Sequence, residues 1–237
     1  MVAVALRIMR EEGLERVTMR RLASELDTGP ASLYVYVANM AELHGALLDE
    51  LLAELELTRE TDAGTARETD AGTARDAGAG TARDAGAGTA RDAGAGTARA
   101  ALTDLLADYI GLLIRYPSLA RSVLSLWPTG PHYLRLVDSL LGLLAAAGVP
   151  ARQAAWGVDL LLQHATATAA EHGTRDESVE ADEQGYDLAT AIQEAAAADH
   201  PHIARVRSDL LSGTGGQRMR WQLAALIDGI ATTPTPE

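Results

Sequence analysis

The residue types that perform catalysis occur in this chain, but their spacing does not assemble a catalytic site. The sequence has no cysteine, which excludes a thiol nucleophile, a disulfide and a cysteine-ligated metal. It contains no G-x-S-x-G, no H-E-x-x-H and no phosphate-binding loop. Asp159 and His164 are five positions apart on an expected helix, so the two side chains do not pair. We therefore expect no enzyme activity.

The histidines and one glycine-containing string also fall short of a cofactor site. His164 and His172 are eight positions apart, and His200 and His202 stand beside a proline, so no pair fixes a metal-ligand spacing. The string Gly-Ala-Gly-Thr-Ala-Arg, residues 78–83, lacks the third glycine and the preceding strand of a dinucleotide loop. We expect neither a metal nor a cofactor.

Composition favours a helical globular protein. Hydrophobic residues make up 47% of the 237 residues, Ala and Leu dominate, and Phe is absent, a mixture that favours helix over strand. No apolar run reaches the roughly 18 residues of a membrane span, and the first residues do not form a signal peptide. We expect a cytoplasmic chain with no membrane partner.

The net charge of −13 argues against nucleic acid, but its distribution weakens that objection. Residues 1–45 hold five arginines and six acidic residues, so this segment is almost neutral. Residues 171–199 hold nine acidic residues and one arginine. All basic residues are arginine, which suits forked phosphate and guanine contacts but could equally reflect genomic base bias.

Hydrophobic periodicity predicts helices throughout and no strand. Thr18 is placed to cap the second helix, residues 27–29 read as a tight turn, and Thr28 could cap the third helix. The loop expected between the last long helices spans residues 173–185. The expected helices cover residues 2–12, 19–26, 30–37, 40–57, 102–116, 118–126, 131–147, 151–172, 186–198 and 217–231.

Residues 60–99 are five tandem octapeptides, ETDAGTAR twice and then DAGAGTAR three times. Their only apolar side chains are those of alanine, so the repeats cannot bury a core and are expected to form a flexible hydrophilic insertion. A weakly helical extension is the alternative, because Ala and Arg tolerate helix. The expected divisions are residues 1–45, a connecting helix 46–57, the insertion 58–100, a second domain 101–231 and a disordered tail 232–237.

The segment TMRRLASELDTGPASLYVYVANMAEL, residues 18–43, resembles the helix-turn-helix of the tetracycline-repressor (TetR) family. The shared pattern is T-x-R-x-L-A-x-x-L, a short turn and S-L-Y-x-aromatic-V, and the resemblance covers residues 1–57. Tyr116-Pro117, Gly130-Pro131 and residues 218–229 look like the C-terminal domain of the tetracycline-repressor branch. The resemblance implies an all-α fold with a three-helix DNA-binding domain and a helical domain that binds ligand and dimerises.

Specific residues carry the expected DNA contacts. A reading helix needs small or polar outward residues so that its backbone approaches the bases, and hydroxyls or arginines near it can contact phosphates. Packing or solvated roles are the alternatives, for Tyr34 and the arginines above all. The candidates are Thr18, Arg20, Arg21, Gly29, Ala31, Ser32, Tyr34 and Tyr36.

Two departures from the family pattern point to weaker DNA binding. Met40 occupies the position where the family usually has a phosphate-binding lysine, which removes one salt-dependent contact. The basic residues that usually precede the first helix are also missing, as a shortened start would explain. A ligand-binding or interaction module that has lost DNA binding is therefore the rival function.

The resemblance implies a ligand pocket between the middle helices, mostly apolar with a few aimed polar groups. The alternative is that the tryptophans are core residues and the histidines are half exposed. The candidate lining residues are Tyr109, Trp127, His132, Tyr133, Trp156, Gln163 and His164.

Dimerisation is expected on the helices around residues 156–168 and 219–230. Small residues would allow close approach of two subunits, with packing inside one chain as the alternative; they are Gly157, Ala165, Ala167, Ala169, Ala224 and Ala225. The implied function is a repressor that binds palindromic operator DNA as a homodimer. A small-molecule effector would favour a second dimer shape and release the DNA, with the fourth helix coupling the two halves.

Overall fold

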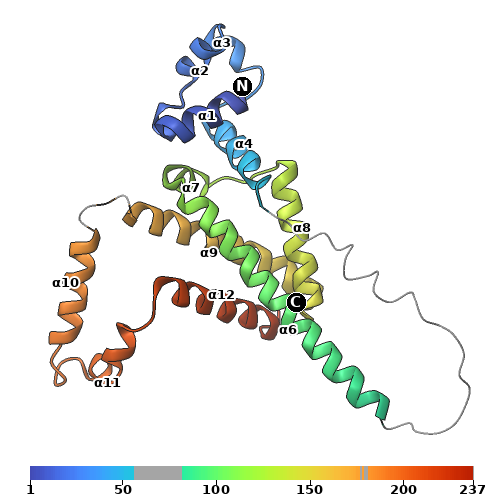
Figure 1. Cartoon of the computed structure of the whole chain (residues 1–237), viewed down its shortest axis with the longest axis vertical. Coiled ribbons are helices and arrows are strands. Elements are labelled where there is room, and N and C mark those ends of the chain that lie inside the picture. Colours follow the sequence, from blue (N-terminus) through green and yellow to red (C-terminus); the bar gives the residue numbers. More distant parts are fainter. Residues whose placement is uncertain (56–81, 177, 179–180, 237) are drawn as a thin grey trace, which may run out of the picture.

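The computed structural model describes residues 1–55, 82–176, 178 and 181–236, and these residues form helices and no strand. Figure 1 shows a small N-terminal group of helices connected to a larger helical body, from which the segment drawn in orange extends to one side. The all-α expectation is confirmed. Repeat residues 60–81 lie outside the described residues.

The N-terminal domain contains α1 (Val2–Glu12), the 3-10 turn η1 (Leu14–Arg16), α2 (Met19–Glu25) and α3 (Pro30–Leu33). Its core contains buried residues from each helix and from the segment after α3, namely Ala5, Ile8, Met9, Leu22, Ala23, Leu33 and Val37. Thr18 caps α2 by accepting a hydrogen bond from the Arg21 backbone N–H at 3.2 Å. The domain therefore forms from short helices that share one apolar centre.

The turn between α2 and α3 lies where it was expected, but α3 is shorter than expected. Asp27 adopts a left-handed backbone with φ 49°, which aspartate tolerates. Gly29, rather than Thr28, is the N-cap of α3. The helix ends at Leu33 because the following Tyr-Val-Tyr-Val run has low helix propensity, and residues 34–36 continue as a turn.

Helix α4 (Met40–Leu52) joins the two domains. Asn39 caps it by accepting a hydrogen bond from the Glu42 N–H at 2.9 Å. Leu43 and Leu47 are fully buried, and α4 packs against α1 on one side and α7 and α8 on the other. It ends five residues before the expected end, so residues 53–55 form a turn.

The body is built from α6 (Ala82–Ile114), α7 (Pro117–Val123), α8 (Pro131–Ala146), α9 (Ala151–Asp176) and α12 (Gly215–Thr232). Helix α6 packs against α9, α8, α12 and α7, so it is the central element. Proline opens α7 and α8 at the position where a missing N–H costs nothing. An ion pair of 2.6 Å between Arg220 and Asp104 joins α12 to α6.

The expected start of the central helix, near residue 102, is too late. Helix α6 begins at Ala82, inside the octapeptide repeats, and Ala98 is already buried against the body. Alanine and arginine have high helix propensity, and packing of the following turns extends the helix back into the repeats. This part of the repeats follows the helical alternative rather than the flexible one.

The region after residue 172 contains two differences from expectation. Helix α9 runs to Asp176 and α10 (Ala181–Glu194) starts soon after, so most of the expected 173–185 loop is helical. Gly173 lies inside α9 and does not end the helix. A Cβ there would lie 2.8 Å from Pro117 Cγ, so glycine allows α9 to pass close to the start of α7. Helix α11 (Pro201–Leu210) was not expected, because Pro201 opens a helix where a break was assumed.

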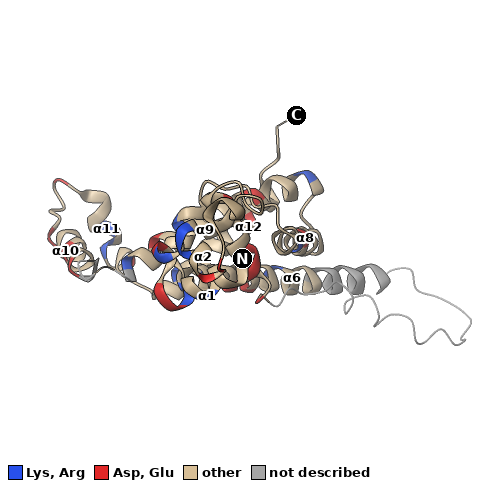
Figure 2. Ribbon diagram, turned by 90° about the horizontal axis from the view of Figure 1, so that it is seen from above, with Lys and Arg blue, Asp and Glu red and all other residues tan. Residues whose placement is uncertain are grey.

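Helices α10 and α11 form an arm beside the body. Figures 1 and 2 both place them to one side of α9 and α12. Helix α11 has no buried residue, whereas the body helices share a continuous core.

Candidate DNA-binding surface and effector pocket

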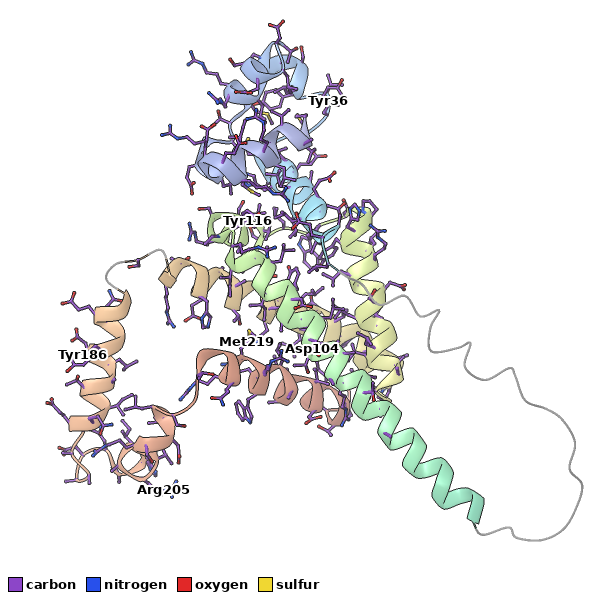
Figure 3. The ribbon with its side chains drawn as sticks, viewed as in Figure 1. Tyr36, Asp104, Tyr116, Tyr186, Arg205 and Met219 are labelled. Carbon is purple, nitrogen blue, oxygen red and sulfur yellow. The ribbon has the colours of Figure 1, made fainter. Side chains whose placement is uncertain are left out.

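The candidate DNA-binding residues all belong to α2, α3 and the short segments next to these helices in the N-terminal domain. All eight are exposed, and the side chain of Tyr36 is 72% accessible. Figure 3 shows Tyr36 at one side of the domain, away from the helical body. We call this set, Thr18, Arg20, Arg21, Gly29, Ala31, Ser32, Tyr34 and Tyr36, the reading surface.

The backbone of the reading surface is accessible as well as its side chains. Gly29 has no neighbouring atom within 4 Å of an added Cβ, and Ala31 and Ser32 follow it on the exposed side of α3. Leu33 alone anchors this short helix in the core. A helix that is anchored in the core and carries small outward side chains can approach base edges closely.

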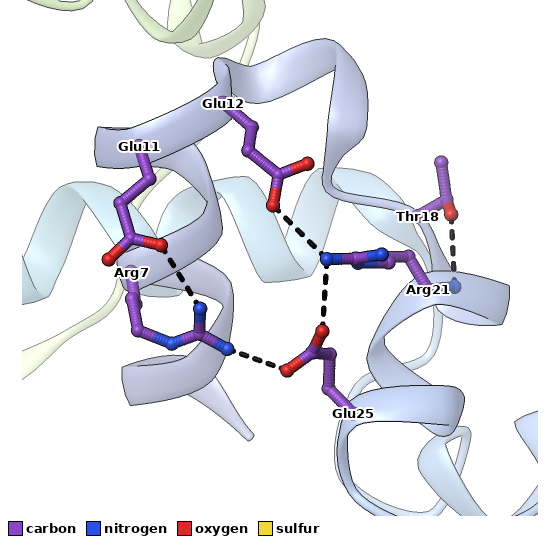
Figure 4. Close-up of polar contacts among 6 residues, drawn as sticks. All are labelled: Arg7, Glu11, Glu12, Thr18, Arg21 and Glu25. Carbon is purple, nitrogen blue, oxygen red and sulfur yellow. Dashed lines mark hydrogen bonds and ion pairs between the residues drawn. The ribbon is translucent and has the colours of Figure 1, made fainter.

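The two arginines of α2 differ in their surroundings. Arg21 contacts Glu12 at 3.1 Å and Glu25 at 3.0 Å, and Glu25 also binds Arg7 at 2.7 Å (Figure 4). Arg20 forms no ion pair with any residue that the structure describes. Arg21 thus ties α2 to α1, while Arg20 presents an uncompensated charge to solvent.

One exposed residue of this surface was not among the sequence candidates. Val35, between the two tyrosines, is 84% accessible. Small or polar side chains were expected on this surface, so the sequence did not point to a valine. The exposure of Val35 depends on where α3 ends, which is at Leu33. Met40, by contrast, is half buried and packs against the core, so it replaces a charged contact by an apolar one.

A cavity of about 250 Å³ lies between α4, α6, α7, α8 and α9. It brings together four of the seven ligand-binding candidates, Tyr109, Trp127, Tyr133 and Gln163. The remaining lining residues are Leu48, Val123, Leu124, Ser125, Leu126, Pro128, Asp159, Leu162 and Thr166. Polar and apolar groups contribute about equally to the lining, so the expectation of a mostly apolar pocket is wrong for this cavity.

The two tyrosine hydroxyls of the cavity come from α6 and α8. The hydroxyl of Tyr109 is hydrogen bonded to Thr166 Oγ1 at 2.8 Å, and burial raises the pKa of Tyr109 to about 12. Burial also raises the pKa of Tyr133, and the charge of Asp159 adds to that rise. Both phenols stay protonated near neutral pH and can donate or accept a hydrogen bond.

Asp159 and Thr166 were missed as lining residues. With Gln163 they occur at i, i+4 and i+7, which places three polar side chains on one face of α9. This stripe was visible in the sequence. Asp159 was considered there only as a partner for His164.

Three candidates lie elsewhere. The ring of His132 binds Asp49, with Nδ1 and Oδ2 2.9 Å apart, so it belongs to the junction of α4 and α8. His164 faces Thr168, with Nε2 and Oγ1 3.5 Å apart. Trp156 stacks near Arg152, 6.0 Å from the ring centre, and lines a different hollow. The rotation of each helix about its axis determines which side chains face the cavity, and composition alone does not predict that rotation.

That second hollow, of about 480 Å³, lies between α9, α12 and residues 233–236. Gln153 Nε2 donates to the Thr233 carbonyl at 2.7 Å, so the start of the expected disordered tail is held against α9. Trp156 borders this hollow with Leu160, Leu226 and Ile230.

The small residues expected between two subunits divide into two groups. An added Cβ on Gly157 would lie 2.5 Å from Ile230 Cγ2, and Ala165 and Ala169 are fully buried, so these three serve packing inside one chain. Ala167, Ala224 and Ala225 are exposed. The expectation that all six face a partner is therefore wrong for the first group.

None of the helices in the described part of the chain has the length and apolar character needed to cross a membrane. Within the same residues, no three His, Asp or Glu side chains gather in a way that could hold a metal ion.

Two family models match this chain, one over the N-terminal domain and one over the C-terminal part. The family model "Bacterial regulatory proteins, tetR family" matches residues 2–47. The family model "Tetracyclin repressor-like, C-terminal domain" matches residues 91–233, which extends into the repeats as α6 does.

Relatives share the same arrangement. SCO7704 of Streptomyces coelicolor is 44% identical, with a TM-score of 0.71 over 100% of this chain and 94% of that one. ActR of Streptomyces coelicolor, solved with (S)-DNPA, is 26% identical with a TM-score of 0.71 over 97% of this chain and 94% of its own. The HTH-type transcriptional repressor DrrR1 of Streptomyces coeruleorubidus is 48% identical over 50 residues, only 21% of this chain and 18% of that repressor. This chain belongs to the tetR family of bacterial regulatory proteins, with an N-terminal helix-turn-helix and a tetracyclin repressor-like C-terminal domain.

Proposed function

We propose that the chain is a transcriptional repressor that binds palindromic operator DNA as a homodimer in the cytoplasm and releases it when a small molecule enters the cavity. The observation that carries this proposal is the reading surface. The eight candidate residues for DNA contact are all exposed on the N-terminal domain, and none of them lines the cavity. DrrR1, which shares 48% identity over 50 residues, is a repressor.

The contacts divide into positioning and reading groups. Arg20, Tyr34 and Tyr36 would contact phosphates, and the small residues of α3 would let its backbone approach base edges in the major groove. Two copies of α3 would then need to lie about 34–36 Å apart, one turn of DNA. Arg21 contributes mainly by holding α2 on α1, because two carboxylates already neutralise it.

The proposed dimer interface is the outer face of α9 and α12. Trp156, Leu160 and Trp221 are large apolar residues left exposed on these helices. Exposed Ala224 and Ala225 allow two copies of α12 to approach closely. Burying this face removes an apolar patch that a monomer would leave in water.

The cavity suggests the chemical class of the effector. Tyr109, Trp127 and Tyr133 offer aromatic surfaces, and Asp159, Gln163 and Thr166 offer acceptors on the opposite helix. We infer an aromatic small molecule that carries hydroxyl or amine donors. ActR has also been solved with actinorhodin, which is therefore a suitable first probe.

A gel-shift titration tests the proposal. The probe is the promoter of the gene next to that of the repressor, with and without actinorhodin and compounds of the inferred class. We expect retardation of the duplex without a compound and release with an active one. A chain that retards no palindromic duplex would refute the proposal.

A ligand-binding module without DNA binding is the second candidate, and Met40 favours it. Its side chain packs against the core where the family has a phosphate-binding lysine. Comparing duplex affinities of the wild-type chain and Met40→Lys separates the two. If only the variant binds, the second candidate is correct. If both bind, with the variant tighter at low salt, the repressor is correct.

A further inference from the structure

A buried carboxylate links the DNA-binding domain to the wall of the cavity. Asp49 lies on α4, only 8% exposed, and reaches the start of α8. Its Oδ1 accepts hydrogen bonds from the backbone N–H groups of His132 and Tyr133, each at 2.9 Å. Its Oδ2 binds His132 Nδ1, also at 2.9 Å.

These contacts cap one helix with a side chain from another. The first N–H groups of a helix have no partner within it, and a negative charge near them is favourable. Helix α8 begins at Pro131 with no cap from its own N-cap residue, Gly130. Asp49 supplies that cap across the junction, 83 positions away in the chain.

The Asp49 carboxylate occupies the place that a side chain at position 130 would take. A Cβ on Gly130 would lie 2.1 Å from Asp49 Cγ and Oδ1, so only glycine permits this contact. Its backbone, φ −68° and ψ 156°, would accept any residue. Glycine is therefore required here for contact with Asp49 rather than for backbone conformation.

The same contacts reach the cavity directly. Tyr133, whose N–H binds Asp49, lines the cavity with its side chain, and so does Leu48, the residue before Asp49. A ligand that displaces Tyr133 or the segment before α8 thus acts on groups bonded to α4. Helix α4 in turn packs against α1, which supports the reading surface.

We propose that Asp49 is a positioning residue that couples the cavity to the reading surface, by fixing α4 to the start of α8. This inference rests on the proposed function and adds the residue that transmits it. Coupling is reciprocal, so duplex binding must change the start of α8 as much as an effector there changes duplex binding. The duplex can therefore serve as the probe while no effector is known.

Amide hydrogen exchange of the full chain, with and without the promoter duplex, provides the test. Asp49→Asn weakens the acceptor, and Gly130→Ala displaces an intact Asp49. Glu50→Gln, an exposed neighbour on α4, is the matched control. Without duplex, both junction variants should exchange the His132 and Tyr133 amides about tenfold faster than wild type.

With duplex, we expect exchange at residues 130–137 to change in wild type and Glu50→Gln but not in the two junction variants, which still bind duplex. If the junction variants bind duplex and transmit the change as wild type does, the inference is overturned and the proposed function stands. If wild type binds duplex without any change there, the inference is likewise overturned. If wild type binds no duplex, both fail.

Discussion

The reading surface and the cavity differ in how their residues are brought together. The reading surface uses a single stretch of 19 residues, 18–36, whose turn and caps form locally. The cavity uses five helices, and its contents depend on how far each helix is rotated. All eight candidates are exposed on the first, whereas three of seven are absent from the second. The exposure of residues in a contiguous motif is therefore predictable before the fold is known, whereas the membership of a cavity assembled from several helices is not.

The largest effect should come from removing the anchor of α3. Leu33→Ala deletes its one buried side chain and should lower the free energy of unfolding by about 2–4 kcal/mol. Chemical denaturation measures this loss. Leu140→Ala, equally buried in α8, should cost a similar amount.

Only the first of these variants should also weaken duplex binding of the folded chain. This pair separates damage to the reading surface from general loss of stability. Equal duplex affinity in the two variants would show that α3 does not position a DNA contact.

The two arginines of α2 should separate phosphate contact from domain packing. Arg20→Ala should reduce duplex affinity about tenfold and lower the slope of log K against log salt by about 1. Arg21→Ala should cost up to about 1 kcal/mol of stability through its exposed ion pairs, with less effect on the slope. Fluorescence anisotropy at several salt concentrations measures both slopes. The reverse ranking would assign the phosphate contact to Arg21.

In the cavity, Tyr109→Phe leaves the buried hydroxyl of Thr166 without its partner and should cost about 1 kcal/mol of stability. Tyr116→Phe, on a half-buried tyrosine outside the cavity, is the control.

Tyr109→Phe should also change how stability depends on pH. The pKa of Tyr109 is raised to about 12, so its contribution to stability is complete below pH 10 and is lost as pH rises toward 12. Tyr109→Phe should flatten this alkaline decline, as followed by denaturation at pH 9 to 12. An unchanged decline in the variant would place the titrating group elsewhere.

The smallest effect concerns the junction below the reading surface. Burial lowers the pKa of His44, which contacts Ser122 across α4 and α7. The unfolded chain therefore binds this proton more readily, and stability falls as pH drops below about 6.5. His44→Gln should lessen that acid dependence, and His202→Gln on exposed α11 is the reference. Identical pH profiles of unfolding for His44→Gln and wild type would contradict this.

Features that form within a few residues were more predictable than helix bounds that depend on packing. Thr18 caps α2 as expected, because the hydroxyl and the Arg21 N–H lie three positions apart and need no tertiary contact. The loop expected around Gly173 and the absence of a helix after Pro201 were wrong predictions. Gly173 serves the close approach of α9 to Pro117, and Pro201 is the first residue of α11. Only packing selects between such uses.

The junction could not be predicted at all. Asp49 and His132 are 83 positions apart, and neither belongs to a local motif. Trp156 shows the same limit, since an aromatic residue on α9 could face the cavity or the outer surface, and its helix rotation selects the latter. The sequence nonetheless identified the four aromatic and amide residues that do line the cavity.

Selection of duplexes from a random pool, with the wild-type chain and with Arg20→Ala, tests the central claim most directly. If paired reading surfaces bind DNA, the wild-type chain will enrich an inverted repeat whose half-sites are centred about one helical turn apart. Arg20→Ala will retain far less of the same duplexes. Enrichment of no sequence, or of single half-sites that Arg20→Ala retains equally well, would contradict the account.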